Sequence, residues 1–159
     1  MILVSFINKR IISIILVVVC TCIMLQPFST VYATNNAPEP RASNYIDSFN
    51  TYIYPAALGK IQVWFTVTGD DYMDDIGALT VRIYESTDQE TWTWVKTYTN
   101  GTTPTLLGHD VFYYSSHVDY QGTIGRYYKA YVTIWAGKDG NGDTRYMWTQ
   151  PKKATLFAS

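Results

Sequence analysis

Hydrophobic and polar residues alternate along most of the chain from Asn44 onward. The clearest alternation lies in residues 60–68, where every second residue is apolar: Ile61, Val63, Phe65 and Val67. The same pattern returns in residues 79–84 and 127–135. A period of two is typical of strands that bury one face and expose the other. The pattern therefore predicts an all-β fold.

Weaker alternation adds four strands, and turn residues separate all of them, including two polar stretches at 69–77 and 137–142. The seven predicted strands are Tyr45–Tyr54, 60–68, 79–84, Thr91–Tyr98, His109–Val118, 127–135 and Thr144–Thr149. No segment has a helical period with caps. About seven short strands are typical of an antiparallel β-sandwich of the immunoglobulin or fibronectin III type, with a small barrel as the alternative.

Two aromatic features bear on this fold. Tyr128 has the inward phase at the start of the sixth strand, where sandwiches of this type often place a tyrosine whose hydroxyl bonds the backbone of the preceding corner. An ordinary core tyrosine is the other interpretation. Trp92 and Trp94 follow a short turn, and we expect them to pack over one end of the core.

The first 33 residues have the pattern of a secretory signal peptide. Lys9 and Arg10 precede the mostly apolar run 11–25, and small residues around Ala33 form a cleavage site. The run is shorter than the roughly 20 residues that a spanning helix needs. We expect a secreted protein. The alternative is that the segment stays uncleaved as an anchor, and only in that case do we expect the protein to contact a membrane. Residues 34–43 then form a flexible linker, and residues 44–159 form a single domain.

Charge and cysteine content exclude several classes of function. Without Lys9 and Arg10, ten of the twelve Lys and Arg residues remain against thirteen Asp and Glu, a net charge of −3. Nucleic-acid binding normally requires a basic patch, so we expect none. Both cysteines, Cys20 and Cys22, lie in the signal segment. The exported domain therefore has no disulfide, thiol nucleophile or cysteine metal site.

Residues 139–143, DGNGD, resemble the start of a calcium loop. A helix-loop-helix calcium site also needs glycine at position 6 and glutamate at position 12, where this chain has Thr144 and Gln150. That motif is therefore excluded. In a sandwich, however, the stretches 69–77 and 137–142 lie at the same end, where their oxygens could converge on Ca²⁺. No other cofactor is expected. The candidate ligands are Asp70, Asp71, Asp74, Asp75, Asp139, Asn141 and Asp143. A solvated acidic tip with a plain hairpin turn is the alternative.

Aromatic residues also gather at outward positions of three predicted strands. The candidate binding surface consists of Tyr84, Tyr127, Tyr131, Trp135, Tyr146 and Trp148, with Arg82 and Lys129 among them. The sequence does not fix which way Tyr146 and Trp148 face. Exposed aromatic patches often mark binding sites, and cross-strand aromatic pairs also stabilise sheets without any ligand. Both interpretations stay open.

Catalytic residues do not form a convergent set. His109 and His117 lie eight positions apart on one predicted strand, which places them on the same face but about 27 Å apart. They cannot share a metal ion on a regular strand. A nucleophile, a base and an orienting group must meet in space for catalysis, and close neighbours on one strand alternate faces. We expect no enzymatic activity.

Five segments resemble an uncharacterised family of small exported Gram-positive bacterial proteins, described only as a domain of unknown function. These segments are RASNYIDSFNTYIYP, GKIQVWFTVTG, MDDIGALTVRIYEST, TWTWVKTY and HVDYQGTIGRYYKAYVTIWAGKDGNGDTRY. They cover most of residues 41–148. The resemblance implies export and a single domain, and it implies no catalytic residue.

The sequence thus favours a secreted, non-catalytic binding module for a cell-envelope glycan or protein. It would act through the aromatic surface or the acidic tip. An exported structural or surface-assembly protein is the alternative from another class, and a small hydrolase is a weaker one.

Overall fold

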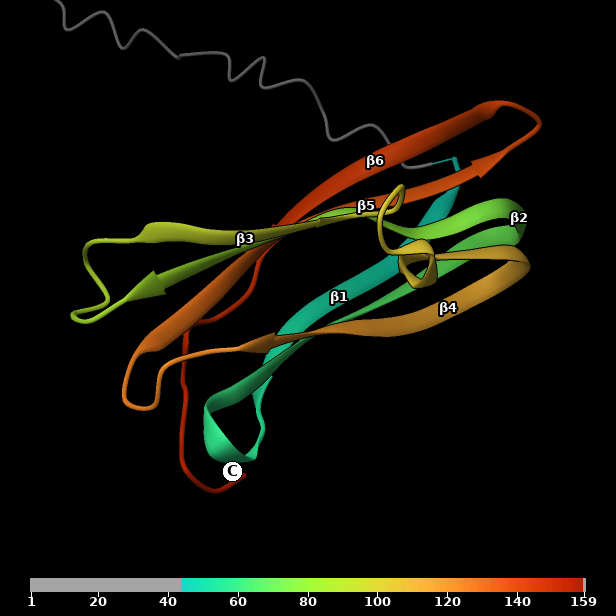
Figure 1. Ribbon diagram of the computed structural model, residues 1–159. Helices are drawn as coiled ribbons and strands as arrows, with labels where there is room; N and C mark the ends of the chain where they lie inside the picture. The colour runs from blue at the N-terminus through green and yellow to red at the C-terminus, as the bar shows by residue number, and fades with distance from the viewer. Residues whose placement is uncertain (1–43, 159) are drawn as a thin grey trace, which may run out of the picture. The chain divides into compact units, whose positions relative to one another are not determined.

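The computed structural model describes residues 44–158, and the predicted signal peptide and linker lie outside them. Seven strands and two short 3-10 turns make up this region (Figure 1). They are β1 Ile46–Pro55, η1 Ala57–Gly59, β2 Lys60–Ser86, β3 Thr93–Thr99, η2 Pro104–Leu106, β4 Leu107–Gln121, β5 Tyr127–Lys138, β6 Asn141–Trp148 and β7 Lys152–Lys153. The prediction of an all-β fold is confirmed. None of the described residues belongs to a helix with the length and apolar character that crossing a membrane requires.

The predicted turn at residues 69–77 is wrong, because β2 continues through it as one strand of 27 residues. The aspartates there suggested a loop, but Met73, which lies between them, and Ile76, which follows them, are buried and pair with β4. Bulges between Thr68 and Met73 and between Ala78 and Thr80 take up the extra residues. Bulges bend a strand and increase its twist, so the polar stretch becomes a bend within β2.

All strand pairs are antiparallel, and the bend in β2 divides the sheet into two parts. The first half of β2 pairs with β1 on one edge and with β4 on the other. The second half pairs with β3 and β5, and β5 also pairs with β6 and β7. The sheet therefore curls, with β1 and β4 in one part and β3, β5 and β6 in the other (Figure 1).

Both parts of the sheet bury their inward residues in one hydrophobic core. The alternating residues Ile61, Val63, Phe65 and Val67 come from the first half of β2, and Tyr128, Ala130, Val132 and Ile134 come from β5. Each large apolar side chain stabilises the fold by about 1.5–3 kcal/mol when fully buried. The outward faces of the two parts therefore lie on opposite sides of this core.

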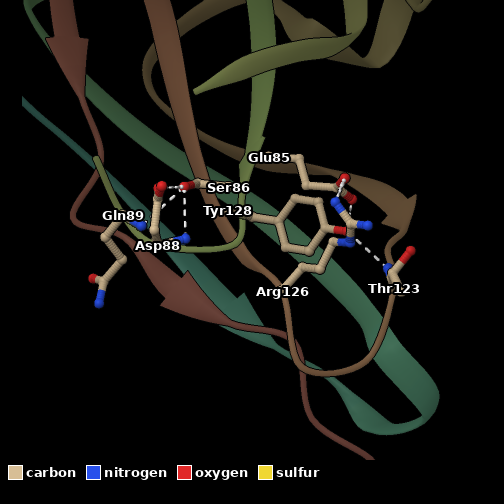
Figure 2. Close-up of polar contacts among 7 residues, drawn as sticks. All are labelled: Glu85, Ser86, Asp88, Gln89, Thr123, Arg126 and Tyr128. Carbon is tan, nitrogen blue, oxygen red and sulfur yellow. Dashed lines mark hydrogen bonds and ion pairs between the residues drawn. The ribbon is translucent and has the colours of Figure 1, made fainter. Parts of the chain in front are cut away.

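Tyr128 fulfils the corner role that its position predicted. Its side chain is fully buried, and its hydroxyl accepts the backbone N–H of Thr123 at 2.7 Å and donates to Glu85 (Figure 2). Arg126 Nη1 lies 2.9 Å from the Glu85 carboxylate and balances its charge. Burial, together with the hydrogen bond to Glu85, raises the pKa of Tyr128 to about 12. A Cβ at Gly122 would lie 2.8 Å from the ring of Tyr128, so glycine there lets the ring reach the turn.

Candidate binding surfaces

Outward side chains of β3, β2, β5 and β6 form three rows, and we call this surface the β5 face. The rows are Thr99, Thr80, Thr133 and Tyr146; Thr97, Arg82, Tyr131 and Trp148; and Trp94, Tyr84 and Lys129. Arg82 lies opposite Tyr131, which in turn lies opposite Trp148. The ring centroids of Tyr131 and Trp148 are 4.8 Å apart, and those of Tyr84 and Trp148 are 5.2 Å apart. Tyr146 stacks on Tyr131 with 5.9 Å between the centroids and 6° between the planes. Four of the six predicted aromatic residues therefore form one cluster, and β6 directs Tyr146 and Trp148 outward.

Tyr127 and Trp135 do not join this cluster. Tyr127 lies opposite β7, where the ammonium group of Lys153 is 5.4 Å from its ring. The Trp135 indole covers the end of the β5–β6 hairpin, since a Cβ at Gly137 or Gly142 would come within 2.6 Å of it. Alternation along β5 predicted that Tyr127, Tyr131 and Trp135 all point outward, but it did not predict how far apart their rings lie.

The tryptophans after the β2–β3 turn belong to the exposed surface rather than to the core. Trp94 is 59% exposed, so the prediction that it packs over the core is wrong. The ammonium group of Lys129 lies 4.3 Å from the ring of Trp92 and 4.6 Å from that of Trp148. Such contacts are favourable because the face of an aromatic ring is electron-rich. Lys129 thereby connects Trp92 to the aromatic cluster.

A network of short polar contacts shapes the turn that carries these tryptophans. The Asp88 carboxylate accepts the backbone N–H groups of Glu90 and Thr91, each at 2.9 Å, and the hydroxyl of Ser86 at 2.8 Å. The backbone N–H of Gln89, which has a φ of 65°, donates to that same hydroxyl (Figure 2). The backbone hydrogen bonds lower the pKa of Asp88, so it stays ionised and keeps the turn in shape.

An open pocket of about 320 Å³ lies beside the cluster, lined by Arg82, Tyr84, Trp94 and Thr97. The indole N–H of Trp94 donates to Thr97 Oγ1 at 3.0 Å, which fixes the orientation of one wall. Arg82 is exposed, and no residue among 44–158 forms an ion pair with its guanidinium. The three outward rows hold two cations, Arg82 and Lys129, and no carboxylate. The β5 face thus combines exposed rings with positive charge.

The two acidic stretches meet at one end of the fold, as predicted. Lys138 Nζ lies 2.6 Å from Asp71, and the backbone N–H of Asp139 donates to Asp74 at 2.7 Å. His109 Nδ1 lies 2.7 Å from Asp75. The hydrogen bond from Lys138 lowers the pKa of Asp71, and the same bond raises the pKa of Lys138. Several carboxylates therefore face protein donors.

The remaining tip residues are Asp70, Asp139, Asn141 and Asp143, and of these the Asp143 carboxylate also faces protein donors. Asp143 accepts the backbone N–H groups of Asn44 and Tyr45, and the side chain of Asn141 donates to the carbonyl of Asp139. Asp139 and Gly140 have φ values of 53° and 74°, which are typical of a two-residue hairpin turn. Asp70 is exposed on the bend of β2. Within residues 44–158, no three His, Asp or Glu side chains form a group arranged for a metal ion. The calcium site stays a prediction, and the hairpin turn is confirmed.

The opposite side of the core carries a second aromatic surface, which the sequence analysis missed. We call it the β1 face, and it consists of two rows across β1, β2 and β4. The first row is Tyr52, Trp64 and His117, and the second row is Tyr54, Gln62 and Asp119. Each strand contributes one ring to the first row, and β1 adds Tyr54 to the second row. The sequence shows the alternation of Tyr52 and Tyr54, but only the strand register places them beside Trp64 and His117.

Hydrogen bonds fix the polar row of the β1 face. Asp119 accepts Gln62 Nε2 at 2.9 Å and Lys60 Nζ at 3.2 Å. Partial burial would raise the pKa of Asp119, but the hydrogen bonds from Gln62 and Lys60 outweigh it and lower the pKa. Asp119 is therefore an ionised acceptor with a fixed orientation.

The two histidines lie in different surroundings. His109 lies opposite Asp75 and His117 lies opposite Trp64, at separate positions along β2. The imidazole of His117 stacks on the Trp64 indole, with the centroids 4.2 Å apart. Each histidine therefore has its own carboxylate neighbour, Asp75 or Asp119.

No protein-family model, curated protein or solved structure matches this chain. The resemblance to a family of exported Gram-positive proteins stays a prediction.

Proposed function

We propose that the protein is a secreted, non-catalytic binding module that holds a cell-envelope glycan on the β5 face. One observation carries this proposal. Tyr84, Tyr131, Tyr146 and Trp148 form a continuous cluster, in which Tyr146 and Trp148 are exposed and Tyr84 and Tyr131 are half-buried. Arg82 and Lys129 stand among these rings. A purely structural ladder would need the rings, but it would not need an exposed guanidinium without an ion-pair partner.

The chemistry of sugars fits such a surface. One face of a pyranose ring exposes C–H groups, which pack on the electron-rich face of an aromatic ring through dispersion and electrostatic attraction. Tyrosine hydroxyls and the indole N–H at the edge of the cluster can bond sugar hydroxyls. Large rigid side chains also lose little conformational entropy on binding.

The two cations favour a glycan that carries acidic groups. A guanidinium bonds carboxylate and phosphate groups through two parallel N–H donors. The pocket beside Arg82 is open and has Tyr84 and Trp94 as walls. An acidic substituent would bond Arg82 while the neighbouring sugar ring rests on an aromatic side chain.

Export is supported by the pattern of the first 33 residues, with its cationic start, apolar run and small residues near Ala33. The resemblance to exported Gram-positive proteins supports it independently. An envelope polymer is the ligand that such a protein meets outside the cell.

The strand order supports an immunoglobulin or fibronectin III type of sandwich. In that fold the second strand shares one sheet with the first and fifth strands, and the third strand shares the other sheet with the last two. When each half of β2 is counted as one strand, its first half is the second strand and pairs with β1 and β4. Its second half is the third strand and shares a sheet with β5 and β6. A sandwich leaves both outer sheet faces free for ligands.

Electrophoresis of the native protein through gels that contain polygalacturonate, an acidic polysaccharide, tests the proposal. We expect the protein to be retarded, and we expect Tyr131→Thr/Trp148→Thr to lose most of the retardation, since hot-spot residues each contribute 2 kcal/mol or more. Tyr72→Thr is the matched control, because Tyr72 is exposed and contacts only Phe112 among the rings. Equal retardation of all three proteins would refute the proposal. Large assemblies of the protein without any glycan would favour the surface-assembly alternative instead.

A further inference from the structure

The β1 face differs from the β5 face in its polar groups. Its aromatic row places Tyr52 and Trp64 side by side, with 6.3 Å between the ring centroids and 5° between the planes. Its polar row brings a tyrosine hydroxyl, an amide and a carboxylate into line, one from each strand. An aromatic row beside a polar row offers both a ring face and hydrogen-bonding groups to one ligand.

A pocket of about 230 Å³ opens between the two rows, lined by Tyr52, Tyr54, Gln62 and Trp64. It is smaller than the 300–1,000 Å³ of pockets for drug-sized ligands. Tyr52 and Tyr54 are 43% and 40% exposed, so part of each ring stays open to a ligand. The space suits a single flat ring with polar substituents on its edge.

The polar row is ready to bond hydroxyl groups. An ionised carboxylate has about four acceptor sites, and Lys60 and Gln62 use two of those on Asp119. Because Gln62 also accepts the Trp64 indole N–H, at 3.4 Å, both ends of its amide are held. Groups that are already oriented lose less entropy when a ligand binds.

The charges on this face balance. Lys60 and Asp119 form an ion pair at 3.2 Å, so the polar row carries no net charge beyond that pair. An acidic ligand gains nothing from it and would meet the Asp119 carboxylate. Neutral hydroxyl groups, which both donate and accept, complement an amide and a carboxylate.

We propose that the β1 face is a second binding site, which takes a ring of a neutral polysaccharide between Tyr52, Tyr54 and Trp64 and bonds its hydroxyls through Gln62 and Asp119. The two sites lie on opposite sides of the core, so one molecule would hold two different glycans at once. The second site does not depend on the first, since the two faces share no side chain.

Affinity electrophoresis in native gels that contain mannan, laminarin or hydroxyethylcellulose tests the second site. We expect retardation in at least one of these neutral gels, and we expect Tyr52→Thr/Trp64→Thr to migrate there as in a blank gel. Tyr131→Thr/Trp148→Thr should keep full retardation in the neutral gel and lose it only in polygalacturonate. Retardation in none of the three neutral gels would overturn the second site, as would equal retardation of the Tyr52→Thr/Trp64→Thr variant.

Asp119→Asn is a second variant that separates loss of binding from loss of folding. This change keeps the shape of the side chain and removes its charge, so a thermal melt should stay close to that of the wild type. We expect binding to the neutral glycan to weaken several-fold. An unchanged affinity would contradict the role of the carboxylate. If sedimentation showed instead that Tyr52 and Trp64 hold two copies of the protein together, the glycan site would be refuted.

Discussion

The two outer faces use the same device, aromatic rings paired across strands, in different electrostatic surroundings. The β5 face places Tyr84, Tyr131 and Trp148 around two cations, while the β1 face places Tyr52 and Trp64 beside the Lys60–Asp119 ion pair. Rings alone therefore do not distinguish a ligand, because both faces have them. The charges between the rings make the difference, and our two proposals rest on them: an acidic glycan on the β5 face and a neutral glycan on the β1 face.

The largest expected effect comes from breaking the core that both faces share. Phe65 is fully buried between them and lies beside Tyr114. Phe65→Ala should lower the free energy of unfolding by about 3–5 kcal/mol, because it removes apolar contacts and leaves a cavity. Urea unfolding measures this loss. On heating, the variant should lose binding on the β5 face and on the β1 face at the same temperature, the one at which it unfolds. Loss of binding on only one face would contradict a shared core.

A smaller effect is expected when only the corner that supports β5 is changed. Tyr128→Phe removes the hydroxyl that bonds Thr123 and Glu85. A buried polar group that loses its partner costs about 1–3 kcal/mol, so the melting temperature should fall while both faces still bind their glycans at 25 °C. A variant as stable as the wild type would show that the corner does not stabilise the fold.

Alkaline pH should act on the same corner without any mutation. The pKa of Tyr128 is about 12 in the folded protein, above the ordinary value near 10 that holds in the unfolded chain. The folded state therefore keeps its proton longer, and this stabilisation is complete below about pH 10 and is lost as the pH rises toward 12. Melting temperatures measured from pH 9 to 12 should fall, and they should fall less steeply in Tyr128→Phe. Parallel curves for the two proteins would argue against this assignment.

The smallest effect is expected at the acidic tip, which neither face includes. The Lys138–Asp71 pair is exposed, and exposed ion pairs contribute about 0–1 kcal/mol. Lys138→Ala should leave both glycan affinities unchanged and the melting temperature nearly so. Because Asp71 and Asp74 already face protein donors, we expect melts in EDTA and in 10 mM calcium to coincide. A rise with calcium that Asp139→Asn abolishes would instead establish a metal site at the tip.

The sequence predicted each strand whose apolar residues alternate, and it predicted the outward phase of Tyr84 and Tyr131. It failed for β2, because the aspartates between Met73 and Ile76 resemble a loop while the bulges that keep the strand intact leave no sequence signal. The direction in which Trp148 points, and the grouping of residues on the β1 face, depend on the register between neighbouring strands. Register is set by pairing between strands that lie far apart in the chain, so alternation within one strand does not contain it.

Titration calorimetry of the protein with acidic oligosaccharides, such as oligogalacturonates, tests the central role of the β5 face most directly. We expect binding that weakens as salt rises, since added ions screen the attraction of Arg82 and Lys129. Tyr131→Thr/Trp148→Thr should bind at least about tenfold more weakly, equivalent to about 1.4 kcal/mol. The variant should still unfold in one cooperative transition, and its free energy of unfolding should fall by no more than about 1 kcal/mol for each aromatic pair that is lost. Equal affinity of the wild type and this folded variant would contradict a glycan site on the β5 face.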